Sequence, residues 1–256
     1  MLRVMERSYL VLDIETILDP ELPISEAAEG EGLPAPPHHQ IVCIGVLWIG
    51  ADYAVRRIGI IGEDKEEAGV LSDFARFLDR HRPTMVTFNG RGFDLPVISA
   101  RCFKHGQPLA YYYQDRDVRY RFCADGHLDL MDFLCDFGAA KRTRLDVSAK
   151  LCGMPGKVGV DGKDVGPLVH AGRIDEVRNY CLCDVVQTAG VFLRTQLLRG
   201  MLDRDAYLTA MSGLMRAAEA DERVAPVCAA WDEARLLLGQ SRVDPEREPQ
   251  TLETEQ

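Results

Sequence analysis

Asp13 and Glu15 are the first residues whose types and spacing could do chemistry. They stand at the end of a short apolar segment, residues 8–14, whose branched side chains predict a buried strand. Residues two apart on a strand point to the same face. Two carboxylates on one face repel each other unless a cation lies between them, and oxygen ligands select hard cations such as Mg²⁺ or Mn²⁺. Alone the pair is a weak metal signature, since acidic residues also end strands beside ordinary loops.

Asp94 is a second acidic position that follows a predicted buried strand, residues 84–88. Residues 89–92, Asn-Gly-Arg-Gly, predict a tight turn after that strand. Asp94 then arrives at or just inside the amino terminus of a predicted helix. The structural alternative is that Asp94 is a helix N-cap and Asn89 a turn residue.

Tyr180 and Asp184 form a third candidate within a predicted helix. Residues four apart share one helix face, and the neighbours on this face are largely apolar. An aspartate on an apolar stripe is costly to bury unless a positive or hydrogen-bonding group meets it. The structural alternative is a core tyrosine beside an aspartate at the solvent edge.

Strands and helices alternate along the chain that carries these residues. The apolar patterns predict strands at 8–14, 41–49, 53–60, 84–88 and 127–130, and helices at 63–80, 94–104, 145–151 and 174–198. A long loop rich in Pro, Gly and Glu spans residues 19–40. The close spacing of the first strands favours an antiparallel meander. The pattern predicts an α/β fold with a mixed sheet flanked by helices.

The chain divides into three parts by pattern. Residues 1–200 are expected to form one α/β domain, and residues 201–239 continue as a helical extension with apolar residues on one face. Residues 240–256 are polar, acidic and without aromatic residues, so they are expected to be a disordered tail.

The composition is that of a soluble globular protein. The chain has 256 residues, of which 46% are hydrophobic and 27% charged. No apolar run approaches the roughly 18 residues of a membrane helix. The first residues reach a charged strand end too soon for a signal peptide. The expected location is therefore the cytoplasm.

The eight cysteines are expected to be reduced thiols. Cys43, Cys102, Cys152 and Cys181 lie in apolar segments, where a free cysteine behaves as a small hydrophobic residue. The Cys181-Leu-Cys183 spacing is not that of a CxxC zinc or redox pair, and no second pair answers it.

The formal net charge of −10 argues against a nucleic-acid partner, but its distribution is uneven. Acidic residues gather at 19–31, at 63–67 and beyond 219, whereas the middle of the chain is basic. This stretch could form a local phosphate track, with ordinary solvated charge as the alternative for each residue. Its members are Arg91, Arg101, Lys104, Arg116, Arg119, Arg121, Lys141, Arg142, Arg144, Lys150, Lys157 and Lys163.

The three motifs occur in the order of a known superfamily. Asp-x-Glu on the first strand, Asn-x3-Phe-Asp after a later strand and Tyr-x3-Asp on a late helix resemble the exonuclease motifs of the DEDDy-type 3′–5′ exonucleases. Within that superfamily the chain looks like the predicted exonucleases related to the proofreading domain of family B DNA polymerases. The resemblance covers about residues 9–198 and implies a ribonuclease H-like fold.

The resemblance implies a two-metal site that holds Mg²⁺ or Mn²⁺. By that resemblance Asp13 would bridge both ions, and Glu15 and Asp184 would complete one of the two sites. Asp94 would serve the second ion. Two such ions stabilise the attacking and the leaving oxygen of a phosphodiester displacement.

The resemblance also implies roles for residues outside the metal set. Tyr180 would orient the attacking water, where a sister branch uses histidine; residues 173–184 contain no histidine. Asn89 and Phe93 would shape the pocket for the terminal nucleotide, with Phe93 stacking or wedging. Asp129 is left outside the metal set, with a structural role expected.

The expected activity is release of nucleoside 5′-monophosphates from the 3′ end of single-stranded DNA, with RNA left open. An aspartyl-nucleophile phosphatase would need Asp-x-Asp after the first strand, and the second position here is Glu15. A catalytically idle ribonuclease H-like module that binds nucleic acid is the remaining alternative. Proofreading, repair and RNA processing stay open, as do the choice between Mg²⁺ and Mn²⁺, the oligomeric state and any protein partners.

Overall fold

A five-stranded mixed sheet forms the centre of the fold. The computed structural model describes residues 7–22, 24, 33–159 and 162–243. The strands are β1 (Tyr9–Leu18), β2 (His39–Ile49), β3 (Val55–Ile60), β4 (Thr84–Thr87) and β5 (His127–Asp129). They lie in the order β3-β2-β1-β4-β5; β3, β2 and β1 are antiparallel, whereas β1, β4 and β5 are parallel. The expected mixed sheet with antiparallel first strands is confirmed.

β1 is longer than the sequence pattern predicted. The apolar run ends near Ile14, but the strand continues to Leu18 because β2 pairs with it along its whole length. β4 pairs only with the first part, Tyr9–Val11. Asp13 and Glu15 therefore lie inside β1, beyond the paired part of β4, rather than at the strand's end.

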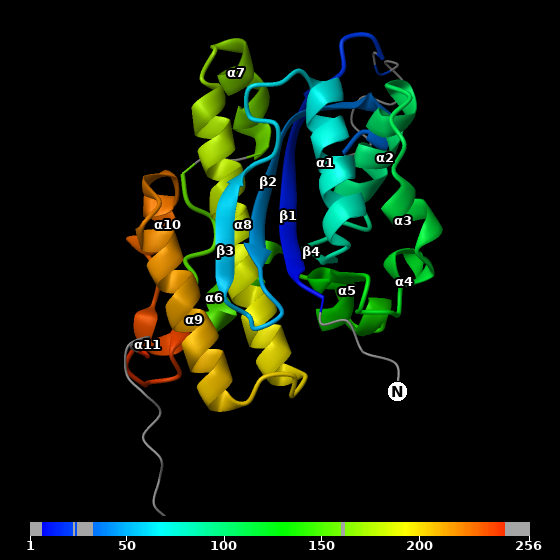
Figure 1. Cartoon of the computed structure of the whole chain (residues 1–256). Helices are drawn as coiled ribbons and strands as arrows, with labels where there is room; N and C mark the ends of the chain where they lie inside the picture. Colours follow the sequence, from blue (N-terminus) through cyan, green and yellow to red (C-terminus); the bar gives the residue numbers. More distant parts are fainter. Residues whose placement is uncertain (1–6, 23, 25–32, 160–161, 244–256) are drawn as a thin grey trace, which may run out of the picture.

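Helices cover both faces of the sheet (Figure 1). On one face lie α1 (Glu67–His81) and α2 (Asp94–Lys104). On the other lies α8 (Ile174–Leu198), with α9 (Arg204–Glu219) packed against it. The shorter helices are α3 (Ala110–Gln114), α4 (Arg116–Arg119), α5 (Leu130–Leu134), α6 (Leu145–Cys152), α7 (Val165–His170), α10 (Ala225–Cys228) and α11 (Glu233–Leu236). Short 3₁₀ turns are η2 (Pro36–His38), η3 (Asp136–Gly138), η4 (Gly162–Asp164) and η5 (Glu222–Val224).

The alternation of side chains along β1 divides the core into two halves. Leu10, Leu12 and Ile14 pack with α1 and α2, whereas Val11 packs with α8. Because side chains on a strand alternate between faces, Asp13 belongs with Val11 on the α8 face, and so does Glu15.

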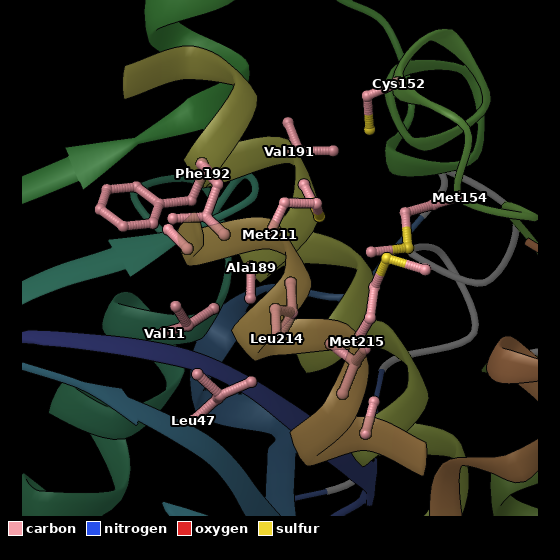
Figure 2. Close-up of a cluster of buried hydrophobic side chains, with 14 of the residues drawn as sticks. Val11, Leu47, Cys152, Met154, Ala189, Val191, Phe192, Met211, Leu214 and Met215 are labelled. Carbon is pink, nitrogen blue, oxygen red and sulfur yellow. The ribbon is translucent and has the colours of Figure 1, made fainter. Parts of the chain in front are cut away.

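α8 and α9 share one apolar core with the sheet. Figure 2 shows Met211, Leu214 and Met215 of α9 gathered with side chains of α8. The helical pattern predicted for residues 203–239 is confirmed as α9, η5, α10 and α11. The division into a domain of residues 1–200 and a helical extension of residues 201–239 stays a prediction.

The predicted tail, residues 240–256, falls largely outside the described residues. Residues 240–243 are described and lie against the last helices. The Arg242 guanidinium pairs with Glu219 and Glu233, and the Val243 N–H donates to the Ser212 hydroxyl at 3.0 Å. Among the helices of the described residues, none has the length and apolarity needed to cross a bilayer.

Several members of the basic stretch make internal contacts. Arg101 is buried, and its Nε and Nη2 donate to the two Glu67 oxygens at 2.7 and 2.6 Å, while Nη1 donates to Asp19. Lys104 donates to Asp19 at 2.7 Å. Arg91 donates to backbone carbonyls, including that of His127 at 3.0 Å. The hypothesis of one phosphate track is therefore wrong for Arg101, whose guanidinium is enclosed between α1, α2 and the end of β1.

Candidate active site

The extended part of β1 carries the first two acidic residues of the site. Asp13 pairs with Gly45 of β2, and Glu15 pairs with Cys43. Glu15 is buried and Asp13 half-buried. Both side chains face α8, as the two-residue alternation of a strand requires.

α8 approaches this part of the sheet closely because Gly45 has no side chain. A β-carbon at Gly45 would lie 2.7 Å from the Cys181 Sγ and 3.2 Å from a Val185 methyl carbon. The Cys181 Sγ lies 3.7 Å from the Asp13 Oδ2. The missing side chain thus lets one turn of α8 lie directly on the strand that carries Asp13.

Tyr180 and Asp184 are brought to the carboxylates by that same turn of α8. They are four residues apart on one face, and the Tyr180 hydroxyl donates to the Asp184 carboxylate. The charges of Asp184, Glu15 and Asp13 all raise the pKa of Tyr180, after burial as the largest cause. The grouping of Tyr180 with these acids, expected from the motif order, is present in the structure.

Asp94 reaches the cluster from the opposite face of the sheet. It is the first residue of α2, and the N-cap is Phe93, so the N-cap alternative for Asp94 is wrong. Its carboxylate accepts a hydrogen bond from the backbone N–H of Ile14, the residue between Asp13 and Glu15. Asp94 is therefore held against β1 at the centre of the acidic pair.

Burial raises the pKa of all four carboxylates, and neighbouring carboxylates raise those of Asp13, Glu15 and Asp94 further. Burial, followed by the charges of Asp94, Glu15 and Asp184, raises the pKa of Asp13 well above its ordinary value. Burial is likewise the main cause that raises the pKa of Glu15, that of Asp94 to about 7 and that of Asp184 to about 6. Buried like charges of this kind are relieved by protons or by cations.

The donor set fits a divalent cation. Ligand atoms of Asp13, Glu15 and Cys181 lie within 4.8 Å of one another, close enough to face one ion. Carboxylate oxygens are the donors that Mg²⁺ and Mn²⁺ prefer, and a thiol is a softer donor beside them. The sequence patterns did not indicate Cys181 as part of the site; its position next to Tyr180 in the motif was the available signal.

Asp129 has the structural role expected for it. Its carboxylate accepts from the backbone N–H groups of Asn89, Arg91, Met131 and Asp132 at 2.9 to 3.2 Å. It therefore fixes the turn that follows β4 and caps α5.

Asn89 and Phe93 both precede Asp94 in that turn. Asn89 has a left-handed backbone (φ 70°), which asparagine tolerates better than most residues, and its carbonyl accepts from the Gly92 and Phe93 N–H groups. The Phe93 ring packs edge-on against His39 with 5.0 Å between ring centroids. These contacts show turn and packing roles for the two residues; their part in a nucleotide pocket stays a prediction.

A small cavity borders the cluster on its α8 side. It has a volume of about 120 Å³, and its lining includes two basic residues, Arg144 and Lys157, two acidic residues, Asp146 and Asp184, and Tyr180. The Lys157 charge lowers the pKa of Asp184, opposite to the effect of its burial. Two members of the basic stretch are thus positioned beside the acidic centre.

The comparisons with known proteins identify the family. Residues 33–234 match the model of a family described as "Predicted 3'-5' exonuclease related to the exonuclease domain of PolB". The chain belongs to this family. The matched segment contains Asn89, Phe93, Asp94, Tyr180 and Asp184, whereas Asp13 and Glu15 precede it. A comparison with curated proteins gives no match.

A solved DNA polymerase structure contains the fold of this chain. A family B DNA polymerase from the archaeon Pyrobaculum calidifontis is 23% identical over 95% of this chain and 31% of the polymerase, with a TM-score of 0.52. E. coli exonuclease I in complex with single-stranded DNA is 13% identical over 81% of this chain and 50% of exonuclease I, with a TM-score of 0.36. The chain thus spans about a third of the length of the polymerase and half of that of exonuclease I.

Proposed function

We propose that this exonuclease hydrolyses the terminal phosphodiester bond at the 3′ end of single-stranded DNA and releases nucleoside 5′-monophosphates. The observation that carries the proposal is the approach of four carboxylates from three elements, Asp13 and Glu15 on β1, Asp94 on α2 and Asp184 on α8, close enough that the charges of the other three raise the pKa of Asp13. The 3′–5′ exonuclease activity is supported by the motif order and the family, and DNA by the family's relation to a DNA polymerase domain.

The four carboxylates would hold two divalent ions, Mg²⁺ or Mn²⁺. The ions, when bound, supply charge stabilisation to the attacking and leaving oxygens of the phosphodiester. The chain supplies the geometry: β1 holds Asp13 and Glu15, the Ile14 N–H orients Asp94, and Tyr180 orients Asp184. Because these hydrogen bonds come from the chain itself, they lower the cost of assembling the site.

Tyr180 would position the attacking water. Its hydroxyl is directed at Asp184, and burial together with the neighbouring carboxylates raises its pKa, so it stays protonated at neutral pH. A neutral hydroxyl can donate to one carboxylate and accept from a water at the same time.

Asn89 and Phe93 would contact the terminal nucleotide, and Arg144 and Lys157 would face its phosphate. The support is their position. Asn89 and Phe93 belong to the turn that leads into Asp94, and Arg144 and Lys157 line the cavity beside Asp184. Arginine and lysine are the usual phosphate contacts.

The direct test is cleavage of an oligonucleotide labelled at either end, with Mg²⁺, with Mn²⁺ or with EDTA. The expected result is release of labelled mononucleotide from the 3′-labelled strand and a shortening ladder from the 5′-labelled strand, with both reactions absent in EDTA. Intact substrate with both metals and folded protein would overturn the proposal and favour the idle binding module. The cytoplasmic location expected from the sequence stays a prediction for cell fractionation.

A further inference from the structure

An exposed group of aromatic rings interleaved with arginines lies outside the acidic site. Tyr113, Tyr120 and Phe122 have exposed fractions of 52%, 52% and 59%, high for large apolar rings. Arg119 lies among them and is itself exposed. We call Tyr113, Arg119, Tyr120, Phe122 and Phe137 the aromatic–arginine surface.

The rings of this surface are held in two groups, Tyr120 with Phe122 and Phe137, and Tyr113 with Arg119, and Arg119 precedes Tyr120 in the chain. Ring centroids are 5.8 Å apart for Tyr120 and Phe122 and 4.8 Å apart for Phe122 and Phe137. The Arg119 guanidinium lies 5.0 Å from the centre of the Tyr113 ring. Such contacts preorganise flat faces and one positive charge that remain open to solvent.

The aromatic–arginine surface is joined to the turn that carries Asp94. Arg91 of that turn donates to the carbonyls of Val118 and Arg119 at 3.4 Å and of His127 at 3.0 Å. Its pKa is lowered by burial, and its guanidinium is used for these backbone contacts. The segment before Tyr120 is therefore fixed relative to the turn that begins at Asn89.

A second connection runs from the aromatic–arginine surface through Asp132 to Asp129. The Arg121 Nε and Nη2 donate to the Asp132 carboxylate at 2.8 Å, and Arg142 lies 3.7 Å from it. The Asp132 N–H in turn donates to Asp129, which holds the Asn89 N–H. Arg144, two residues after Arg142, lines the cavity beside Asp184. Asp132 thus joins the segment that carries Phe122 to the turn at Asn89, and its charge is paired with those of Arg121 and Arg142.

We propose that the aromatic–arginine surface binds the 5′ continuation of a single-stranded DNA whose 3′ end lies in the acidic site. The inference rests on the proposed function and extends it to the path of the strand. Aromatic faces that stack on bases, set among arginines that meet phosphates, are the chemistry of sequence-tolerant single-strand binding. A duplex hides its bases within the stack, so exposed rings offer it little contact.

The test measures binding of a 5′-fluorescent 12-nucleotide DNA by anisotropy, with EDTA present to prevent cleavage. Phe122→Ala and Tyr120→Ala are each expected to raise the Kd about tenfold, as the loss of one stacking face does. Phe122→Tyr keeps a ring and is expected to restore binding. Arg119→Gln is expected to reduce the slope of log K against log salt by about 0.7, one phosphate contact.

Phe103→Ala is the matched control. Phe103 is 91% exposed on α2 and lies outside the aromatic–arginine surface, so its loss is expected to change the Kd less than about twofold. Unchanged binding in both Phe122→Ala and Tyr120→Ala, with melting temperatures like the parent, would overturn the inference. So would an RNA 12-mer that binds more tightly than the DNA.

A kinetic ratio separates this inference from the proposed function. With Mg²⁺ or Mn²⁺, kcat/KM is measured for a 12-mer and for a dinucleotide, which contains the scissile bond but little of the strand beyond it. Phe122→Ala is expected to lower kcat/KM for the 12-mer about tenfold relative to kcat/KM for the dinucleotide. Parent protein that cleaves neither substrate contradicts the proposed function. In that case the anisotropy measurement alone tests whether the aromatic–arginine surface binds DNA. An unchanged ratio in an active variant contradicts the surface.

Discussion

Gly45 and Cys181 are in contact across the interface of β2 and α8. A β-carbon on Gly45 would lie 2.7 Å from the Cys181 sulfur, closer than packed atoms approach. Asp13 is the residue paired with Gly45, and Tyr180 and Asp184 belong to the same turn of α8 as Cys181. The absence of one side chain therefore sets the distance between two of the three elements that form the acidic site.

Gly45→Ala is expected to push this turn of α8 away from β1. Misplacement of reacting groups by about 1 Å costs about 100-fold in rate, and overpacking of a core about 1–3 kcal/mol in stability. Cleavage rate and urea denaturation measure the two effects. Gly59→Ala in β3 is the control, because its β-carbon would meet only Arg57 at 3.8 Å. Equal activity of the two variants would contradict the account of α8.

The carboxylate cluster is expected to destabilise the metal-free protein increasingly as the pH rises. The folded-state pKa values lie above those of the unfolded chain, so this contribution is fully present below about pH 4. It is lost as the pH rises through about 6 for Asp184 and about 7 for Asp94.

Thermal melting between about pH 5 and pH 8, with EDTA or with Mn²⁺, measures this dependence. Mn²⁺ is expected to flatten the slope, since the ion replaces protons in offsetting the repulsion. Asp13→Asn in EDTA should melt higher than the parent near pH 8 because one charge is gone. His127, buried with a lowered pKa, contributes in the opposite direction up to about pH 6.5, so the quantity compared is the difference between Mn²⁺ and EDTA at each pH. A difference that does not grow between about pH 5 and pH 8 would contradict the repulsion.

Tyr180→Phe is expected to slow turnover without abolishing it. The ring can still pack on α8, but the hydroxyl that donates to Asp184 is lost. The expected fall in kcat is about 100-fold, at the low end for a lost proton-handling group, with KM little changed. Tyr207→Phe is the control, since this buried tyrosine donates to the Leu236 carbonyl away from the site. Full activity of Tyr180→Phe would remove Tyr180 from the site.

Arg101→Met is expected to destabilise the fold by about 3–5 kcal/mol, because it leaves the buried Glu67 and Asp19 carboxylates without their cation. Urea denaturation measures the loss. Lys104→Met, which removes a partly exposed partner of the same Asp19, is expected to cost much less, because solvent screens its ion pair. Similar losses in the two variants would show that the Arg101 network has no special weight.

The sequence predicted the positions of the long helices well where residues that begin or end helices flank them. α2 and α8 begin and end at the predicted residues: Pro96 stands in the first turn of α2, and Gly172 and Gly200 flank α8. β1 extends past the prediction to Leu18, since pairing with β2 continues after the apolar run ends. That pairing partner is distant in sequence, so no local pattern shows it.

The grouping of the acidic residues could be predicted only from motif order. Local spacing indicated that Asp13 and Glu15 share a face, but nothing local brings Asp94 or Asp184 to them. The basic stretch was the weakest prediction: Arg101 and Arg91 are charged residues that bind internal carboxylates and carbonyls. A charge pattern does not distinguish a solvent-facing arginine from one enclosed by partners elsewhere in the chain.

The measurement that tests the central claim most directly is calorimetric titration of the folded protein with Mn²⁺, beside Asp13→Asn. The claim is that Asp13, Glu15, Asp94 and Asp184 together hold the ions that cleavage requires. It predicts uptake of two ions by the parent, and loss of at least one of them together with cleavage in Asp13→Asn. A parent that takes up no Mn²⁺, with or without an oligonucleotide, or an Asp13→Asn variant with unchanged uptake and cleavage, would contradict it.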